Sequence, residues 1–132
     1  MDFQFEFDCN GVDGSRPLLY LWDVGGRLYI GKASRGSKRP LKHYARNVSR
    51  LLAGQPYRRG KPNGFRKVHL AMQAAVLQSQ RIRLVLLKNV ELARINEEEL
   101  TAIKQYGCEL NEQWPRGCLL TQWPSARDAS AA

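Results

Sequence analysis

The residues best suited to phosphate chemistry follow a pair of tyrosines. Tyr20 and Tyr29 are nine positions apart, and Lys32 comes shortly after the second of them. Arg39 and His43 are four positions apart, the spacing at which two side chains share one face of a helix. A guanidinium binds phosphate oxygens with a planar fork, and an imidazole with a pKa of about 6.5 accepts a proton at neutral pH. This set could therefore bind a phosphate group and move a proton beside it.

A carboxylate that could hold a metal ion, Glu99, comes much later in the sequence than these residues. Glu99 precedes Asn111 by twelve positions. A carboxylate is a hard ligand for Mg²⁺, which takes one or two of them and keeps several waters. Both residues also have a structural alternative. Asn96 and Glu99 have the spacing of a capping box at a helix start, and Asn111 could be a helix-end residue near Gly107.

The positive charge is concentrated in the middle of the chain. Residues 15–90 carry seventeen of the Lys and Arg residues and a single acid, Asp23, within a total net charge of +9. Such a segment repels itself in isolation and becomes favourable when it displaces counterions from a polyanion. The alternative is a basic surface that serves only solubility. The exclusion of acids over so long a stretch favours nucleic-acid binding.

Strands are expected first along the chain. Phe3, Phe5 and Phe7 alternate with polar residues, the period of a half-buried strand. The segments 18–22 and 27–31 are rich in aromatic and branched residues, and the glycines between them favour a tight β-hairpin turn.

Helices and one more strand follow. We predict helices over 38–53 with Ser37 as N-cap, over 65–79 and over 97–106, and a central strand over 82–87. The first helix has an apolar stripe that includes Tyr44 and, opposite it, a basic face. The order predicts an α+β domain with a small, mostly antiparallel sheet flanked by helices.

The polar loop 55–64 contains glycines, prolines and basic residues and is suited to contacts with a nucleic-acid backbone. His69, among apolar neighbours in the second helix, is predicted to be structural. The predicted DNA contacts are the basic residues of the loops and the first two helices, namely Arg35, Lys38, Arg46, Arg50, Arg58, Arg59, Lys61, Arg66 and Lys67.

The arrangement of these candidate residues resembles the GIY-YIG nuclease family. The first motif is present in altered form, without its glycine, and the second is intact; the matching positions are Leu19-Tyr20-Leu21, Tyr29-Ile30-Gly31, Arg39, His43, Glu99 and Asn111. The resemblance covers residues 18–114, nearly the whole chain. It implies a small antiparallel sheet of three strands flanked by helices, to which the N-terminal segment could add a strand.

The resemblance also implies an activity, the hydrolysis of double-stranded DNA with Mg²⁺ or Mn²⁺. By it, Glu99 holds the ion, Arg39 binds the phosphate and Asn111 maintains the local structure. Tyr29 activates the attacking water, with Tyr20 or His43 sharing the proton. A tyrosine, with a pKa of about 10, needs nearby positive charge to act as a base. Lys32 could supply that charge, and His43 is the better base by its own chemistry.

The organisation of the chain limits how it could act. One nuclease domain is expected over residues 1–124, with a flexible tail over 125–132. No segment has the length of a membrane span and no secretory signal opens the chain, so a cytoplasmic protein without a membrane partner is expected. Cys9, Cys108 and Cys118 are expected to be reduced; the alternative is a Cys108–Cys118 disulfide.

Several functional readings remain open. Without a separate DNA-binding domain, a compact restriction-type or phage-type endonuclease is favoured, and a structure-specific repair nuclease is an alternative. Cutting of both strands by so small a chain would need two or more copies, so a homo-oligomer is expected. Two rivals are a catalytically silent DNA-binding module of the same fold, suggested by the altered first motif, and an RNA-binding protein.

Overall fold

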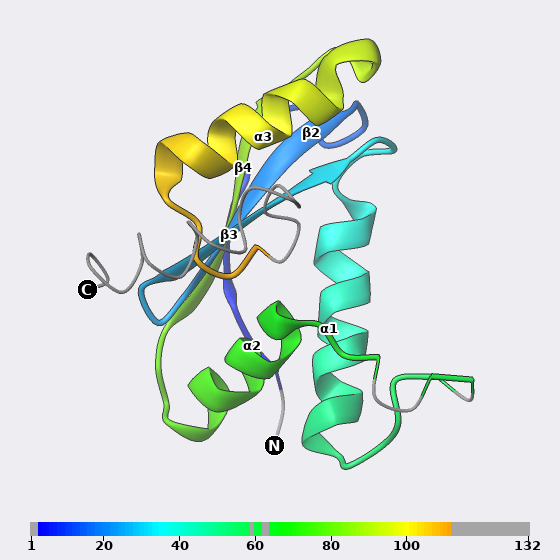
Figure 1. Cartoon of the computed structure of the whole chain (residues 1–132), viewed down its shortest axis with the longest axis vertical. Coiled ribbons are helices and arrows are strands. Elements are labelled where there is room, and N and C mark those ends of the chain that lie inside the picture. The colour runs from blue at the N-terminus through cyan, green and yellow to red at the C-terminus, as the bar shows by residue number, and fades with distance from the viewer. Residues whose placement is uncertain (1–2, 59, 62–63, 112–132) are drawn as a thin grey trace, which may run out of the picture.

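The computed structural model of the chain describes residues 3–58, 60–61 and 64–111. They form a four-stranded sheet with α1 and α2 on one face and α3 on the other (Figure 1). The strands are β1 (Glu6–Asp8), β2 (Leu18–Val24), β3 (Arg27–Ala33) and β4 (Ile82–Asn89). The helices are α1 (Lys38–Leu52), α2 (Lys67–Leu77), the short 3₁₀ turn η1 (Leu92–Arg94) and α3 (Ile95–Tyr106). None of the helices described is both long and apolar enough to cross a bilayer.

The predicted hairpin is confirmed and is longer than expected. β2 and β3 pair antiparallel over their full lengths, from Leu18 opposite Ala33 to Val24 opposite Arg27. Gly25 and Gly26 form the turn with positive φ angles of 59° and 95°, a conformation that glycine adopts without strain. The Gly26 N–H donates to Asp23 Oδ1 at 2.9 Å, which closes the turn.

The sheet has one more strand than the antiparallel three-stranded core that the family resemblance implies. Its order is β1-β4-β2-β3, and β1 pairs with β4 in parallel, so the sheet is mixed. The extra strand is short because only residues 6–8 reach the edge of β4. The aromatic residues before it explain its position: Phe5 packs edge-on against Trp22 at 4.9 Å between ring centroids, and Phe3 lies at 6.2 Å. This packing fastens the N-terminal segment to the sheet and covers the edge of β4.

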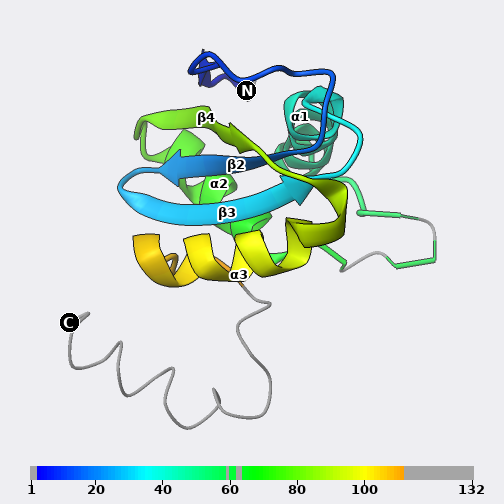
Figure 2. The same cartoon turned by 90° about the horizontal axis from the view of Figure 1, so that it is seen from above.

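Strand alternation divides the core between the two faces of the sheet. Leu18, Tyr20 and Trp22 of β2 belong to the cluster that packs under α1 and α2. Leu19 and Leu21 belong to a smaller cluster under α3. Figure 2 shows α3 alongside β3, so β3 is bordered by helices on both faces. A side chain on β3 therefore belongs to one helical layer or the other according to whether its position is odd or even.

Two helices, α2 and α3, begin at other residues than predicted. α1 begins at Lys38 as expected, although the Ser37 hydroxyl donates to Gly14 O at 3.3 Å instead of capping the helix. α2 begins at Lys67 and not at 65, because Arg66 is extended. α3 begins at Ile95, two residues early, because η1 leads directly into it. The capping box of Asn96 and Glu99 is therefore wrong, since Asn96 is already inside the helix.

Candidate active site

Three tyrosines from three elements meet under α1 and α2. Tyr20 of β2 and Tyr29 of β3 point to the same face of the sheet, where Tyr44 of α1 packs against both. The ring centroids of Tyr20 and Tyr29 are 6.5 Å apart, and that of Tyr44 lies 5.9 Å and 6.2 Å from them. The three side chains are almost fully buried, yet each carries a hydroxyl that needs a hydrogen-bond partner.

Arg66 joins these hydroxyls into one network, the tyrosine–arginine cluster (Tyr20, Tyr29, Tyr44 and Arg66). Its two terminal nitrogens donate to the hydroxyls of Tyr29 and Tyr44, each at 3.0 Å. The hydroxyls of Tyr44 and Tyr20 are hydrogen-bonded to each other at 2.8 Å. The guanidinium lies over the Tyr29 and Tyr44 rings at 5.6 Å and 5.5 Å. A charged and partly buried side chain is thus held by neutral groups.

Gly31 makes room for this cluster. A Cβ atom at position 31 would lie 2.4 Å from the Cζ and hydroxyl oxygen of Tyr20, much closer than atoms can approach. The Tyr20 ring occupies this space over β3. The glycine of the Tyr29-Ile30-Gly31 segment is therefore required by packing, whatever the chemistry of the site.

The tyrosines of the cluster are poor proton acceptors. Burial raises the pKa of Tyr29 well above its usual range, and the neighbouring Tyr44 raises it further. Burial and Tyr29 likewise raise the pKa of Tyr20, and burial and Tyr20 raise that of Tyr44. All three remain protonated at neutral pH and can act as hydrogen-bond donors.

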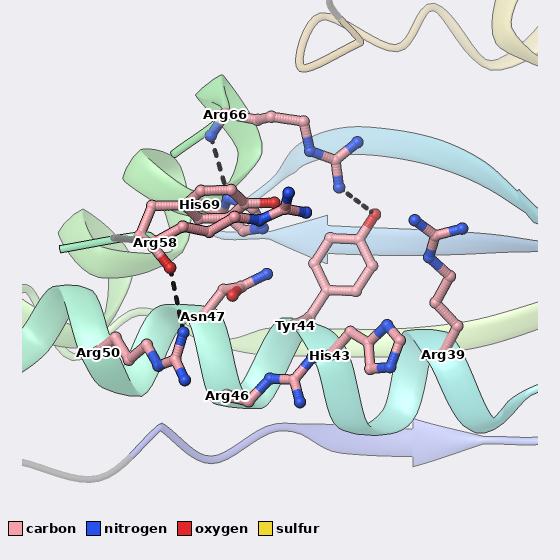
Figure 3. A pocket seen from close by; sticks show the side chains of 10 residues that line it. Arg39, His43, Tyr44, Arg46, Asn47, Arg50, Arg58, Arg66 and His69 are labelled. Carbon is pink, nitrogen blue, oxygen red and sulfur yellow. Dashed lines mark hydrogen bonds between the residues drawn. The ribbon is translucent and has the colours of Figure 1, made fainter. Parts of the chain in front are cut away.

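The cluster opens on a basic pocket of about 400 Å³ between α1 and the segment leading into α2 (Figure 3). We call it the arginine pocket. Among the described residues, its lining contains five arginines and no aspartate or glutamate; the residues are Arg39, His43, Tyr44, Arg46, Asn47, Arg50, Tyr57, Arg58, Arg66 and His69. In Figure 3 the Arg66 side chain reaches toward Tyr44, and Arg39 and His43 project from the same helix as Tyr44. A concave site with this charge is suited to a phosphate group.

His43 is exposed and close to other positive groups. Its partial burial lowers its pKa from the ordinary value, and the positive charges of Arg46, Arg39 and Lys38 lower it further. The imidazole is therefore neutral at neutral pH and has a free pair of electrons for a proton. It also lines a second cavity, of about 520 Å³, which shares Arg39 and His43 with the arginine pocket.

The other predicted DNA contacts fall into several places. Arg46, Arg50 and Arg58 line the arginine pocket, and Arg35 and Lys38 line the second cavity. Lys61 is exposed and its backbone pairs with that of Arg58. The Lys67 ammonium donates to Glu109 O at 3.0 Å. Arg59 lies outside the described residues, as do residues 112–132, which include the end of the predicted domain, the predicted tail and Cys118. Cys9 and Cys108 are free thiols.

His69 is structural, as predicted, but it also borders the arginine pocket. Only 1% of it is exposed, and its Nδ1 accepts the Arg66 backbone N–H at 3.0 Å. The Nε2 atom must therefore carry the proton. Within the described part of the chain, this buried N–H has no hydrogen-bond partner. Burial lowers the pKa of His69 to about 4, with a further contribution from Arg66.

The low pKa of His69 predicts that the fold loses stability in mild acid. In the unfolded chain His69 takes up a proton below pH 6.5, its ordinary pKa, and in the folded chain only near pH 4. The unfolded state thus binds more protons between these values, and His69 alone lowers the free energy of unfolding by about 3 kcal/mol across this window. Urea unfolding at several pH values measures the effect. A glutamine keeps an acceptor for the Arg66 N–H without titrating, so His69→Gln should remove this part of the pH dependence; an unchanged slope contradicts the assignment.

Glu99 lies on the other face of the sheet. It is 3% exposed, and its Oε1 is 3.8 Å from the Lys32 ammonium, too far for a hydrogen bond. Lys32 donates instead to Asn96 Oδ1. Burial raises the pKa of Glu99, and Lys32 opposes this shift. No group of three or more His, Cys, Asp or Glu residues that could hold a metal occurs in the described ranges. Glu99 could therefore serve as a single carboxylate ligand, with water completing the shell.

Asn111 fastens the chain to the free edge of β3. Its Oδ1 accepts the Ile30 N–H at 2.9 Å, and its Nδ2 donates to Ile30 O at 2.6 Å. The Leu110 N–H adds a bond to Leu28 O at 3.0 Å. The side chain thus replaces a neighbouring strand beside Tyr29. This geometry agrees with the role in local structure that the sequence resemblance implies.

Two members of the cluster were missed by the sequence analysis. Tyr44 was assigned to the apolar stripe of its helix, which is correct for the ring but not for the hydroxyl. Arg66 was predicted as a DNA contact, and its hydrogen bonds to Tyr29 and Tyr44 were not foreseen. The loop contribution of Tyr57 was not anticipated either. No local pattern indicates these roles, since each depends on contacts between residues that are far apart in the sequence.

No family model, curated protein or solved structure matches the chain in comparisons with known proteins.

Proposed function

We propose that the protein is a Mg²⁺-dependent endonuclease that hydrolyses phosphodiester bonds of double-stranded DNA. One observation carries the proposal: the tyrosine–arginine cluster opens on a pocket whose described lining has five arginines and no acid. Tyr20, Tyr29, Arg39 and His43, the matching residues that precede the loop, all lie in this cluster or pocket. The proposal thus combines the resemblance to GIY-YIG nucleases with a pocket whose positive charge suits a phosphate.

In this proposal Arg66 binds the phosphate that is cleaved. An arginine stays protonated, and its partners in the cluster are phenol oxygens in place of carboxylates. A phosphate oxygen is a stronger acceptor than a neutral hydroxyl, so a phosphate entering the pocket competes for the same N–H groups. Arg39 lines the pocket as a second cation. The freed hydroxyls of Tyr29 and Tyr44 could then donate to the phosphate as its negative charge grows.

His43 is a better candidate than Tyr29 for the base that activates water. A base must be unprotonated before the reaction, and His43 meets this condition because its pKa is lowered. Tyr29 does not, because burial and Tyr44 raise its pKa by more than the charge and hydrogen bond of Arg66 lower it. In this proposal Tyr29 acts as a donor and His43 takes the proton from water.

Glu99 would hold the metal ion. Its carboxylate is buried, and its single ion pair in the described structure is a long one, which leaves oxygen electron pairs for a cation. A Mg²⁺ or Mn²⁺ bound there would stabilise negative charge on a DNA phosphate that lies at that face of the sheet. Lys32, beside Glu99, would then move its ammonium away from the ion. Tyr29 points to one face of β3 and Lys32 to the other, so the proposed metal ligand and the arginine pocket lie on opposite faces of this edge strand.

The state of His43 predicts an acidic limb in the pH profile of cleavage. The rate should be constant near neutral pH and decline as the pH falls through a pKa below 6.5, because His43 is then protonated. His43→Gln should lower the rate about 10²-fold and abolish that limb. Single-turnover rates between pH 5 and 8 measure both effects. A limb that persists in His43→Gln, or a change of less than about threefold, assigns the base to another group.

The test of the activity itself uses supercoiled plasmid with Mg²⁺ or with EDTA. The proposal predicts nicked or linear plasmid with Mg²⁺ and intact plasmid with EDTA. If plasmid survives with Mg²⁺ at protein concentrations that retard it on a gel, the silent DNA-binding module is the correct reading. A parallel competition between duplex DNA and duplex RNA at fixed salt tests the substrate, and a preference for RNA overturns the DNA assignment.

A further inference from the structure

The arginine pocket is larger than one phosphate requires. The proposed reaction centre, with Arg39, His43 and Arg66, occupies one end of it. The other end follows α1 to Asn47 and Arg50, and a rise of 1.5 Å per residue places Arg50 about 10 Å beyond His43. Arg58 borders the same end from the loop. A volume of about 400 Å³ is in the range of pockets that hold a whole small ligand.

The far end of the pocket is built by specific contacts between α1 and the loop. Arg50 donates to Tyr57 O at 3.1 Å, which fixes the loop to α1 (Figure 3). The Arg58 guanidinium lies over the Tyr57 ring at 5.1 Å. Tyr57 also packs edge-on against Phe65, with ring centroids 5.3 Å apart, and faces His69 at 6.2 Å. These contacts hold Arg58 near the pocket.

Two features of this end indicate that it receives an anion. In the part of the chain that the structure describes, no acid lines the pocket to balance its arginines, so they repel one another until a negative group enters. His69, which also lines the pocket, is only 1% exposed. Its Nε2–H has no acceptor within the described chain. A buried donor beside uncompensated cations favours a ligand rich in oxygen acceptors.

We infer that the far end of the arginine pocket, formed by Asn47, Arg50, Arg58 and His69, binds a second phosphate of the nucleic-acid strand, next to the one that is cleaved. The inference rests on the proposed function in one respect, namely that the bound strand is the DNA that is cleaved. Arg58 and Arg50 neutralise this second phosphate, and Asn47 offers an amide donor to it. Binding there holds the strand in one register relative to Arg66 and His43.

The first test measures DNA binding without cleavage. A fluorescent 20-base-pair duplex is titrated in EDTA with wild type, Arg58→Gln and Arg27→Gln, at several salt concentrations. Arg27 is exposed at the start of β3 and is not part of the pocket, so it is the matched control. Arg58→Gln should weaken binding about tenfold and should reduce the slope of log K against log salt concentration by about 0.9 in magnitude. Arg27→Gln should match wild type. Equal behaviour of the two variants overturns the inference.

The second test reports on the pocket itself. The ¹⁵N signals of the His69 ring are followed by NMR at neutral pH as duplex is added in EDTA. They should shift in wild type and in Arg27→Gln, and much less in Arg58→Gln. An unchanged His69 signal at saturating duplex overturns the inference. A second combination of results also overturns the inference: inorganic phosphate shifts the His69 signals as much as duplex does, and Arg58→Gln binds duplex as tightly as wild type. The pocket is then a site for free phosphate. Since both tests omit Mg²⁺, they can succeed where cleavage fails, which separates this inference from the proposed function.

Discussion

Replacing Arg66 with glutamine is expected to lower the rate of DNA cleavage about 10³-fold at saturating DNA. Arg66 is the donor to two phenol oxygens of the cluster and the proposed donor to the phosphate, and loss of one such donor at a developing charge lowers a rate by about 10²–10³-fold. Arg66→Lys should not restore activity, since a lysine cannot donate in two fixed directions to Tyr29 and Tyr44. Single-turnover rates on plasmid measure the effect.

Two controls separate chemistry from folding in the Arg66 variants. Circular dichroism and urea unfolding should show a folded protein that is less stable by about 1–3 kcal/mol, because two buried hydroxyls lose a donor. Arg27→Gln removes an arginine outside the pocket and should cut within about twofold of wild type. A folded Arg66→Gln that cuts within about threefold of wild type places the reaction elsewhere.

Replacing Glu99 with glutamine is expected to remove metal-dependent cleavage, with a loss of at least about 10³-fold. The reason is that Glu99 is the proposed ligand of the ion, whose stabilisation of transition-state charge amounts to several kcal/mol. Glutamine has nearly the same shape and cannot balance a divalent charge. Burial already disfavours the Glu99 carboxylate, so the neutral variant should fold at least as well as wild type at neutral pH.

Glu98 is the matched control for Glu99. It is next in sequence, accepts a bond from Lys88 at 2.7 Å and is partly exposed. Glu98→Gln should cut within about twofold of wild type. Addition of Mn²⁺ should raise the melting temperature of wild type and of Glu98→Gln but not that of Glu99→Gln, which tests the ligand without any cleavage. The reverse result, with Glu98→Gln inactive and Glu99→Gln active, means that the proposed ligand is off by one position.

The hairpin and the side chains on it could be predicted because they depend on local sequence. Two glycines in the turn set the register of β2 against β3, and alternation then places Tyr20 and Tyr29 on one face. The same holds for Arg39 and His43, whose spacing keeps them together on α1. These four residues reach one site in the structure with no correction to their positions.

The network around Arg66 could not be predicted, because it depends on how α2 meets α1. Helical periodicity places the Tyr44 ring in the core but says nothing of what its hydroxyl meets. Arg66 looks like a surface residue in a basic segment, and only the extended backbone before α2 directs it inward. The pairing of β1 with β4 and the first residue of α3 were not predicted for a similar reason. Aromatic packing on Trp22 sets the first, and the turn η1 sets the start of the second.

The measurement that most directly tests the central claim is single-turnover cleavage of plasmid with Mg²⁺ by wild type and Arg66→Gln, in samples whose binding is checked on the same gel. The claim is that the tyrosine–arginine cluster and the arginine pocket are where DNA is cut. It predicts that wild type converts the plasmid to nicked or linear form while Arg66→Gln retards it and leaves it intact. Equal conversion by both proteins, or retardation without conversion by wild type, contradicts it.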